Sequence, residues 1–156
     1  MKRVGLTHCG MAFVENIVIR NLKVEDAEEV QRIQYAITKT ADDIDYRRAV
    51  ENVVSGGQHV AVAAEVNGAF AGYMITYMLL GGFGLPKSAW ITNFGVDPVY
   101  MGQGIGKRLA QWVLSDYRER GVTHVYTTVP WDSVDLLSFF RTIGFDRSNF
   151  INLCKK

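Results

Sequence analysis

The residues best suited to chemistry lie in a glycine-rich turn, Met-Gly-Gln-Gly-Ile-Gly-Lys, at positions 101–107. The turn separates an apolar run at residues 90–96, typical of a buried strand, from an apolar repeat that predicts a helix starting near residue 105. Backbone N–H groups in the first turn of a helix lack intrahelical partners, and the helix dipole adds partial positive charge there. Glycines let an anion approach these groups without meeting a Cβ atom. We therefore predict a phosphate or pyrophosphate cradle, to which Lys107 adds positive charge.

Two other phosphate-binding patterns fit this turn poorly. The dinucleotide spacing Gly-x-Gly-x-x-Gly is not matched, and no acidic residue ends a second strand about 20 positions later. The P-loop pattern fails because the turn has no Gly-Lys-Ser/Thr. We assign the cofactor contacts to the whole turn, which comprises Met101, Gly102, Gln103, Gly104, Ile105, Gly106 and Lys107.

The remaining segments must position this turn. Apolar periodicity and turn residues predict strands at residues 13–20, 59–66, 69–80, 90–96, 123–129 and 145–153. They predict helices at about residues 23–37, 44–54, 105–120 and 133–143. Asn67-Gly68 between two strand patterns predicts a β-hairpin. The order β-α-α-β-β-β-α-β-α-β predicts an α/β fold, an α+β mixed sheet with helices on both faces.

Two separated motifs resemble the GNAT superfamily of N-acetyltransferases, and the resemblance covers residues 16–156. The first combines Val-Asp-Pro at 96–98, Tyr100 and Gly-Ile-Gly at 104–106, similar to the family's coenzyme A loop between a strand and a helix. The second, Leu-x-x-Phe-Phe-x-x-x-Gly-Phe at 136–145, is similar to the family's closing motif. Met101 departs from the family's usual arginine or glutamine. The resemblance implies the GNAT-like acyl-CoA N-acyltransferase fold with acetyl-CoA as co-substrate.

The resemblance also implies roles for residues around the turn. In the family, the strand before the turn carries a bulge whose amides face the thioester carbonyl and the pantetheine arm, and we assign this role to Phe94, Gly95 and Val96. A glycine inside a strand independently suggests either a bulge or a close backbone approach at Gly95. Asp132 or Ser133 stands where an asparagine of the family often bonds the pantetheine arm.

The general acid and the general base do not both fall on the family's usual residue types. The family's frequent tyrosine acid falls on Phe140, which has no proton to give. Tyr126 on the neighbouring strand is our candidate acid, with Asp132, Asp135 and Ser138 as alternatives. For the base, Asn93 could hold a water molecule that relays the amine proton, and Glu65 is the alternative.

These assignments predict an acetyl-CoA-dependent N-acetyltransferase that acts on a primary amine by direct attack in a ternary complex. The amine could belong to a small metabolite, a peptide N-terminus or a lysine. The missing tyrosine at Phe140 keeps a second reading open, a non-catalytic module that binds and senses acyl-CoA. Tyr46 and Tyr77 are candidates to line the acceptor cleft. Dimerisation is common in the family, so a homodimer is a further expectation.

Length and charge limit the other classes of function. A chain of 156 residues predicts one domain at residues 16–156 after an N-terminal arm at residues 1–15. A net charge of +1 gives no general attraction to nucleic acid or to an anionic membrane, and no apolar run reaches the roughly 18 residues of a membrane span. No His, Cys and carboxylate spacing predicts a metal site. Cys9 and Cys154 are expected to be reduced thiols in a cytoplasmic protein.

Overall fold

A five-stranded sheet forms the centre of the computed structural model, which describes residues 16–82 and 84–156. The strands lie in chain order across the sheet, and every neighbouring pair is antiparallel except β4 and β5, which are parallel. The strands are β1 (Ile17–Asn21), β2 (Val60–Val66), β3 (Ala69–Leu79), β4 (Ser88–Val96) and β5 (His124–Thr127). The mixed sheet confirms the predicted fold class, whereas the predicted N-terminal arm and residues 13–15 of the first strand lie outside the described residues.

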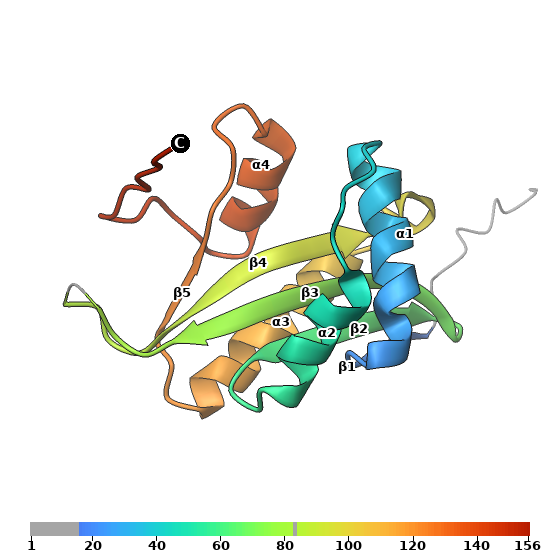
Figure 1. The fold of residues 1–156 in the computed structure, drawn as a ribbon, viewed down its shortest axis with the longest axis horizontal. Helices are drawn as coiled ribbons and strands as arrows, with labels where there is room; N and C mark the ends of the chain where they lie inside the picture. Colours follow the sequence, from blue (N-terminus) through green and yellow to red (C-terminus); the bar gives the residue numbers. More distant parts are fainter. Residues whose placement is uncertain (1–15, 83) are drawn as a thin grey trace, which may run out of the picture.

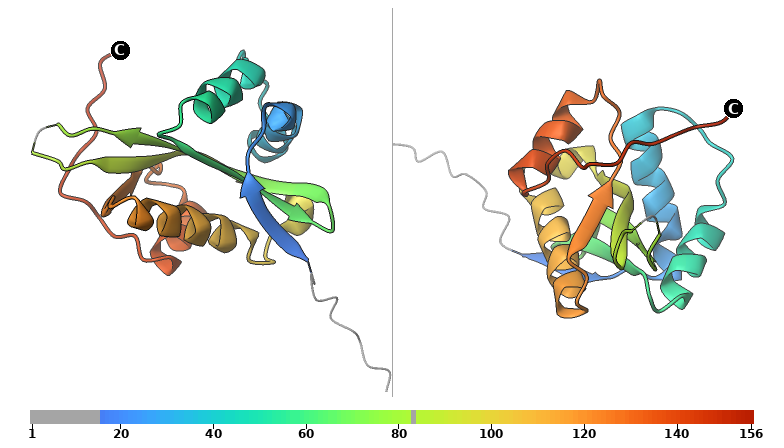
Figure 2. Two further views of the ribbon diagram at one scale, coloured as in Figure 1. Left: turned by 90° about the horizontal axis from the view of Figure 1, so that it is seen from below. Right: turned by 90° about the vertical axis from the view of Figure 1, so that its left-hand side faces the viewer.

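Helices cover both faces of this sheet (Figures 1 and 2). On one face lie α1 (Ala27–Thr38), preceded by the short 3-10 helix η1 (Val24–Asp26), and α2 (Tyr46–Ser55). On the other face lie α3 (Ile105–Glu119) and α4 (Val134–Thr142), and the 3-10 helix η2 (Pro98–Tyr100) links β4 to the glycine-rich turn. We call these the α1/α2 face and the α3 face.

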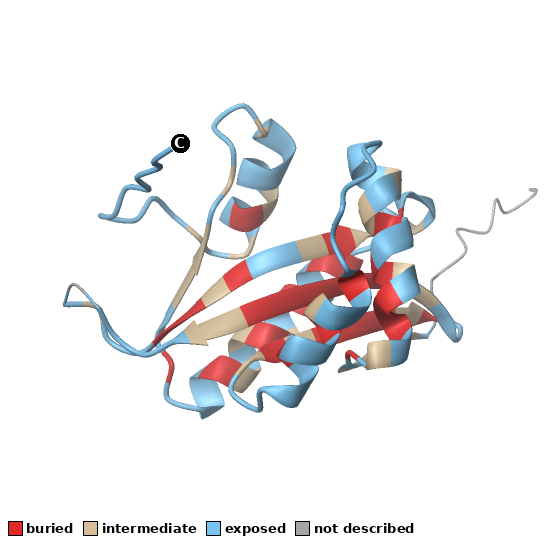
Figure 3. Cartoon of the chain, in the orientation of Figure 1, coloured by how far each residue is buried: buried red, intermediate tan, exposed pale blue. Residues whose placement is uncertain are grey.

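β3 is buried along most of its length (Figure 3), and its side chains are divided between the cores on the two faces. Tyr73 and Ile75 pack with buried residues of α1 and α2, while Met74 packs with buried residues of α3. Successive side chains of a strand point to opposite sides, so a strand that is buried on both faces contributes to two cores. The buried Thr76 hydroxyl lies 2.6 Å from the Tyr117 hydroxyl, which satisfies both polar groups inside the α3 face.

The predicted hairpin between β2 and β3 is confirmed. Asn67 and Gly68 have φ values of 50° and 82°. Positive φ at both central residues is the signature of the two-residue turns that match the twist of antiparallel strands. This turn sets the register that brings Val66 opposite Ala69.

A β-bulge interrupts β4 at Thr92. Ile75 of β3 lies opposite Asn93, but the next residue of β3, Thr76, lies opposite Ile91. Thr92 is therefore the extra residue, and its hydroxyl donates to the Ile75 carbonyl oxygen at 3.3 Å. A bulge of this kind reverses the alternation of every residue that follows it in the strand.

β4 and β5 separate soon after they begin. They pair only from Ser88 opposite His124 to Ile91 opposite Thr127, after which β5 ends and β4 continues to Val96. Figure 1 shows the two strands diverging, with α4 beyond the opening between them. Among the described residues, no strand pairs with residues 92–96 on the side away from β3. Their backbone groups on this side are free to meet a ligand.

The predicted last strand is wrong, because residues 145–153 form no strand in the structure. The chain bends there through local hydrogen bonds. The Asp146 carboxylate accepts from the Arg147 N–H, and the Ser148 hydroxyl accepts from the Phe150 N–H. Short polar side chains that bond neighbouring backbone groups compete in this way with strand pairing. Phe145 alone of this segment's aromatic residues packs against the core, with its ring 5.2 Å from that of Phe140.

Candidate active site

The glycine-rich segment at residues 101–107 includes the first three residues of α3, and two of its glycines adopt a left-handed conformation. Gly102 has a φ of 79°, and Gly104, the N-cap of α3, has a φ of 78°. Residues with a Cβ atom rarely adopt this conformation. Apart from the adjoining residues, no heavy atom lies within 4 Å of the Cβ position at either glycine, so the space around the turn is open.

The turn exposes a row of backbone N–H groups without partners. Among the described residues, no acceptor bonds the N–H groups of residues 102–107, and the first bonded amide in this stretch is that of Arg108, which donates to the Gly104 carbonyl at 3.1 Å. Lys107 and Arg108 are exposed beside these groups, and no acidic residue lies in the first turn of α3. Free amides, a helix N-terminus and two cations make this a site of positive potential that suits a pyrophosphate.

Gly106 has a different role from the other two glycines. A Cβ atom at Gly106 would lie 2.9 Å from the Phe94 ring and 3.1 Å from the Phe139 ring. Those two rings are stacked with their centroids 4.9 Å apart. Gly106 thus allows β4, α3 and α4 to pack closely behind the turn.

The three residues that we assigned to the acyl group lie at the end of β4, just beyond the bulge. Phe94 and Val96 pack with the α3 face, whereas Gly95 is buried against α1, where a Cβ atom would lie 2.9 Å from Ile33 and 3.0 Å from Tyr73. Of the two readings of Gly95, the structure supports the close approach, because the bulge falls at Thr92. All three belong to the part of β4 that faces the opening toward β5.

The candidate proton-transfer residues lie on the α1/α2 face. Asn93 lines a pocket beneath α1 and α2 and is exposed. Tyr126 lies opposite Trp90 in the β4–β5 pairing, and their rings stack with centroids 5.1 Å apart. The side chains of Asn93 and Tyr126 accept or donate no hydrogen bond among the described residues, and the buried Nε1 of Trp90 has no acceptor there either. Of these groups, the exposed Asn93 amide and the half-buried Tyr126 side chain are available to a bound substrate.

The other candidates have weaker positions. Asp132 is exposed in the turn before α4, and Ser133 is the N-cap of α4 without making a side-chain capping bond. Asp135 and Ser138 are exposed on α4 itself. Glu65 accepts from the Arg20 guanidinium at 2.6 Å, so this carboxylate is already engaged in an ion pair.

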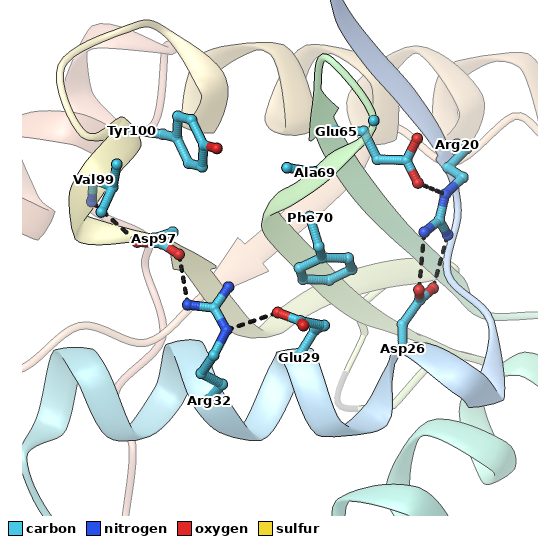
Figure 4. A pocket seen from close by; sticks show the side chains of 11 residues that line it. Arg20, Asp26, Glu29, Arg32, Glu65, Ala69, Phe70, Asp97, Val99 and Tyr100 are labelled. Carbon is cyan, nitrogen blue, oxygen red and sulfur yellow. Dashed lines mark hydrogen bonds and ion pairs between the residues drawn. The ribbon is translucent and has the colours of Figure 1, made fainter.

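Sequence reasoning did not find the ion-pair network around Arg20 and Arg32, which lines a hollow of about 600 Å³ between α1, β2, β3 and η2 (Figure 4). Arg20 bonds both carboxylate oxygens of Asp26 at 2.7 and 2.8 Å, and Arg32 bonds Asp97 at 2.6 Å and Glu29 at 2.7 Å. Arg32 and Asp97 are 65 positions apart, and no local pattern connects them. The hollow is therefore lined by ion-paired side chains, in which the carboxylates outnumber the guanidinium groups.

The Arg32–Asp97 pair links α1 to the residue after β4, and the Arg20–Asp26 pair links β1 to η1. Burial alone would raise the pKa of Asp97, but hydrogen bonds from the Val99 N–H and from Arg32 outweigh it and lower the pKa. Burial of Asp26 is likewise outweighed by bonds from Arg20 and the Lys23 N–H, which lower its pKa. Both carboxylates thus favour the folded state when they are charged.

A second, smaller pocket of about 120 Å³ lies between α1, α2 and the sheet, and Tyr46, Tyr77 and Asn93 are among its lining residues. The Tyr46 hydroxyl donates to Asp42 at 2.7 Å, and burial together with this carboxylate raises the pKa of Tyr46 to about 12. Within residues 16–82 and 84–156, no cluster of three His, Cys, Asp or Glu side chains could hold a metal ion. The described helices include none long and apolar enough to cross a membrane.

Comparison with known proteins gives consistent matches. The model of the acetyltransferase (GNAT) family matches residues 21–145. Over 57 residues the chain is 42% identical to the N-alpha-acetyltransferase RimI of Mycobacterium tuberculosis, covering 36% of this chain and 34% of that protein. Over 82 residues it is 27% identical to the ribosomal protein bS18-alanine N-acetyltransferase of Escherichia coli K12, covering 53% of this chain and 51% of that protein. The chain thus matches about a third to a half of the length of these curated relatives.

The fold also matches solved structures. An aminoglycoside N-acetyltransferase in complex with CoA superposes with a TM-score of 0.77 at 13% identity, covering 90% of this chain and 95% of that chain. At this identity the match shows that the sheet and helices are arranged alike, and it does not identify the acceptor substrate.

Proposed function

Because the chain belongs to the GNAT family of acetyltransferases, we propose that it transfers an acetyl group from acetyl-CoA to a primary amine. The observation that carries this proposal is the set of unpartnered N–H groups at residues 102–107, next to the free edge of β4. Six amides without acceptors at the start of a helix form a site for a pyrophosphate, and coenzyme A contains one.

Acetyl-CoA would supply an acetyl thioester, which an unprotonated amine can attack. The amides of the turn, with Lys107, would bind its pyrophosphate, and the edge of β4 at Phe94, Gly95 and Val96 would hold the pantetheine and the acyl carbonyl. Asp132 and Ser133, across the opening before α4, would contribute polar contacts to the same arm. The chain's main contribution is then to hold two substrates in one orientation.

Asn93 and Tyr126 would handle the protons. The Asn93 amide can accept from the incoming amine or hold a water molecule that takes its proton, and the Tyr126 hydroxyl can donate toward the leaving thiolate. Both side chains belong to the α1/α2 face beside the point where β4 and β5 separate. The amine would therefore approach from the side of α1 and α2.

The acceptor amine would belong to a peptide N-terminus, a lysine or a small metabolite. The two bacterial relatives are named as an N-alpha-acetyltransferase and as a ribosomal protein alanine N-acetyltransferase, which favours the first class. A single domain at residues 16–156, a homodimer and a cytoplasmic location stay predictions from the sequence.

The test is a calorimetric and thermal-shift titration of the full chain with acetyl-CoA, CoA and NAD. A ligand that binds only the native state at 100 times its Kd stabilises it by about 2.7 kcal/mol. We expect acetyl-CoA and CoA to stabilise the chain and NAD to leave it unchanged. An amine screen that detects free thiol then measures the transfer itself.

The outcomes separate the two readings of the sequence. Thiol release with at least one class of amine supports the enzyme. Tight binding of acetyl-CoA with no release across the screen favours the non-catalytic module, and no stabilisation by acetyl-CoA overturns both readings.

A further inference from the structure

We propose that the small pocket between α1, α2 and β3 binds the side chain next to the acceptor amine, and that the chain selects N-terminal residues with a short aliphatic side chain. This inference rests on the proposed acetyl transfer and names its substrate class. The pocket, which we call the acceptor pocket, has a volume of about 120 Å³.

Size and lining both favour an aliphatic group. Six of the lining residues are apolar: Val30, Ile44, Ala49, Val50, Val53 and Ile75. A cavity of about 150 Å³ with a similar lining stays dry and binds a benzene-sized molecule. The acceptor pocket is therefore large enough for a branched side chain of about four carbons and too small for a sugar ring with its substituents.

The polar side chains in and beside the pocket fall into two groups, those bonded elsewhere and those without a partner. The Tyr46 hydroxyl is turned to Asp42, and the hydroxyl of the neighbouring Tyr73 donates to Gln34 at 2.8 Å. Tyr77 and Asn93, by contrast, make no side-chain hydrogen bond among the described residues. These two side chains can bond the amine and the first peptide carbonyl while the aliphatic group enters below them.

The pocket offers no charge that would balance an ammonium group. None of its lining residues is acidic or basic. Asp42 and Asp45 are not among the lining residues: Asp42 accepts from the Ile44 N–H and the Tyr46 hydroxyl, and Asp45 accepts from the Arg48 N–H. An ammonium group buried here would lose its hydration without a counter-charge in the lining. A lysine side chain or a polycationic aminoglycoside is accordingly a poor occupant.

The bulge at Thr92 connects the acceptor pocket to the proposed reaction centre. Without the extra residue, Asn93 would point to the α3 face, away from α1 and α2. With it, Asn93 lines the pocket while remaining exposed, one residue before the part of β4 assigned to the acyl group. An amine held at Asn93 therefore has its own side chain directed at the pocket.

The experiment compares peptides that differ only in their first residue: Gly, Ala, Val, Leu, Phe and Lys, each followed by one common sequence. The readout is kcat/KM for acetyl-CoA-dependent thiol release. One methylene in an apolar pocket changes kcat/KM by about 10-fold or more. We expect kcat/KM to rise at least about 10-fold from Gly to Val or Leu and to fall for Phe and Lys.

Two variants locate the effect in this pocket. Ala49→Leu fills the pocket, so the ratio of the Val rate to the Gly rate should fall toward one. Ile44→Ala, at an exposed position before α2, widens the pocket and should shift the preference to Leu and Phe. Arg48→Leu places the same leucine on the exposed side of α2 and is the matched control, which should keep the wild-type series. Thermal melting verifies that each variant is folded.

The results separate this inference from the proposed function. Three results would overturn the pocket assignment while leaving acetyl transfer intact. They are equal kcat/KM across the peptide series, the highest kcat/KM for the Lys peptide, and a series that does not change in the folded Ala49→Leu and Ile44→Ala variants. An absence of thiol release from every peptide, despite acetyl-CoA binding, counts against this substrate class. Release from small-molecule amines in the same assay then shows whether the proposed function itself survives.

Discussion

Trp90 and Asn93 belong to the same face of the sheet although they are three residues apart in one strand. Trp90 lies opposite Tyr77, and Tyr77 and Asn93 line the same pocket. In a regular strand, residues three apart point to opposite faces. The bulge at Thr92 removes this opposition and brings an amide side chain to the side from which the amine is proposed to approach.

The position of Asn93 predicts a loss of turnover without a loss of stability in Asn93→Ala. The side chain is exposed and makes no hydrogen bond within the described chain, so the free energy of unfolding should change by less than about 0.5 kcal/mol. Turnover should fall by about 100-fold, because proton transfer from the amine loses its relay. Thiol release and urea unfolding measure the two effects. Asn149→Ala, at another exposed asparagine, is the control, and equal activity of both variants would remove Asn93 from the mechanism.

The glycine-rich turn predicts a specific defect in Gly104→Glu. The side chain would occupy the open space before the free amides and would repel an anion there. We expect the Kd for acetyl-CoA to rise by about 100-fold or more, which corresponds to about 2.7 kcal/mol. Calorimetry measures this change.

A matched variant separates anion exclusion from backbone strain. Gly57→Glu lies at another exposed glycine with a φ of 62° and no atom within 4 Å of its Cβ position. Both variants should lose about 1–2 kcal/mol of stability from the left-handed backbone. Only Gly104→Glu should weaken acetyl-CoA binding, so equal Kd values for the two variants contradict the cradle.

Replacement of Phe140 is expected to affect the stability of the fold alone. Its ring is 6% exposed and contacts the rings of Phe139 and Phe145 at centroid distances of 5.1 and 5.2 Å. Phe140→Ala should lower the free energy of unfolding by about 3–5 kcal/mol because it opens a cavity in the α3 face. Phe150→Ala, at a ring that is 47% exposed, should cost much less. A stable Phe140→Ala variant with altered turnover would place this ring in the site instead of the core.

The two carboxylates with lowered pKa values predict a loss of stability in acid. A carboxylate whose pKa is lower in the folded state than in the unfolded chain stabilises the fold above its ordinary value near 4 and loses this contribution as pH falls through the folded pKa. The free energy of unfolding should therefore decrease from about pH 5 downward.

Asp97→Asn tests this pH dependence directly. It should cost about 1–3 kcal/mol at pH 7, where the charged bonds to Arg32 and Val99 are intact, and less at pH 3. Urea unfolding at pH 7, 5, 4 and 3 gives the comparison. Asp43→Asn, at an exposed carboxylate, should follow the wild-type curve, and an Asp97→Asn curve parallel to the wild type contradicts the assignment.

Local signals were reliable wherever the chain itself determines the conformation. The Asn67-Gly68 turn and the glycines at 102 and 104 were predictable because their backbone angles are accessible to few other residues. The predicted strand at 145–153 failed because its apolar residues resemble a strand pattern, while the polar side chains of Asp146 and Ser148 bond the backbone locally. The apolar periodicity does not indicate whether strand pairing or local hydrogen bonding by these side chains is more stable.

The sequence by itself determined the family, the order of the elements through α4 and the place of the glycine-rich turn before α3. Only the tertiary structure decided the bulge at Thr92, the separation of β4 from β5, the Arg32–Asp97 pair and the acceptor pocket. The physical reason is that turns and helix starts depend on residues within a few positions, whereas strand register, ion pairs and cavities depend on residues far apart in the chain.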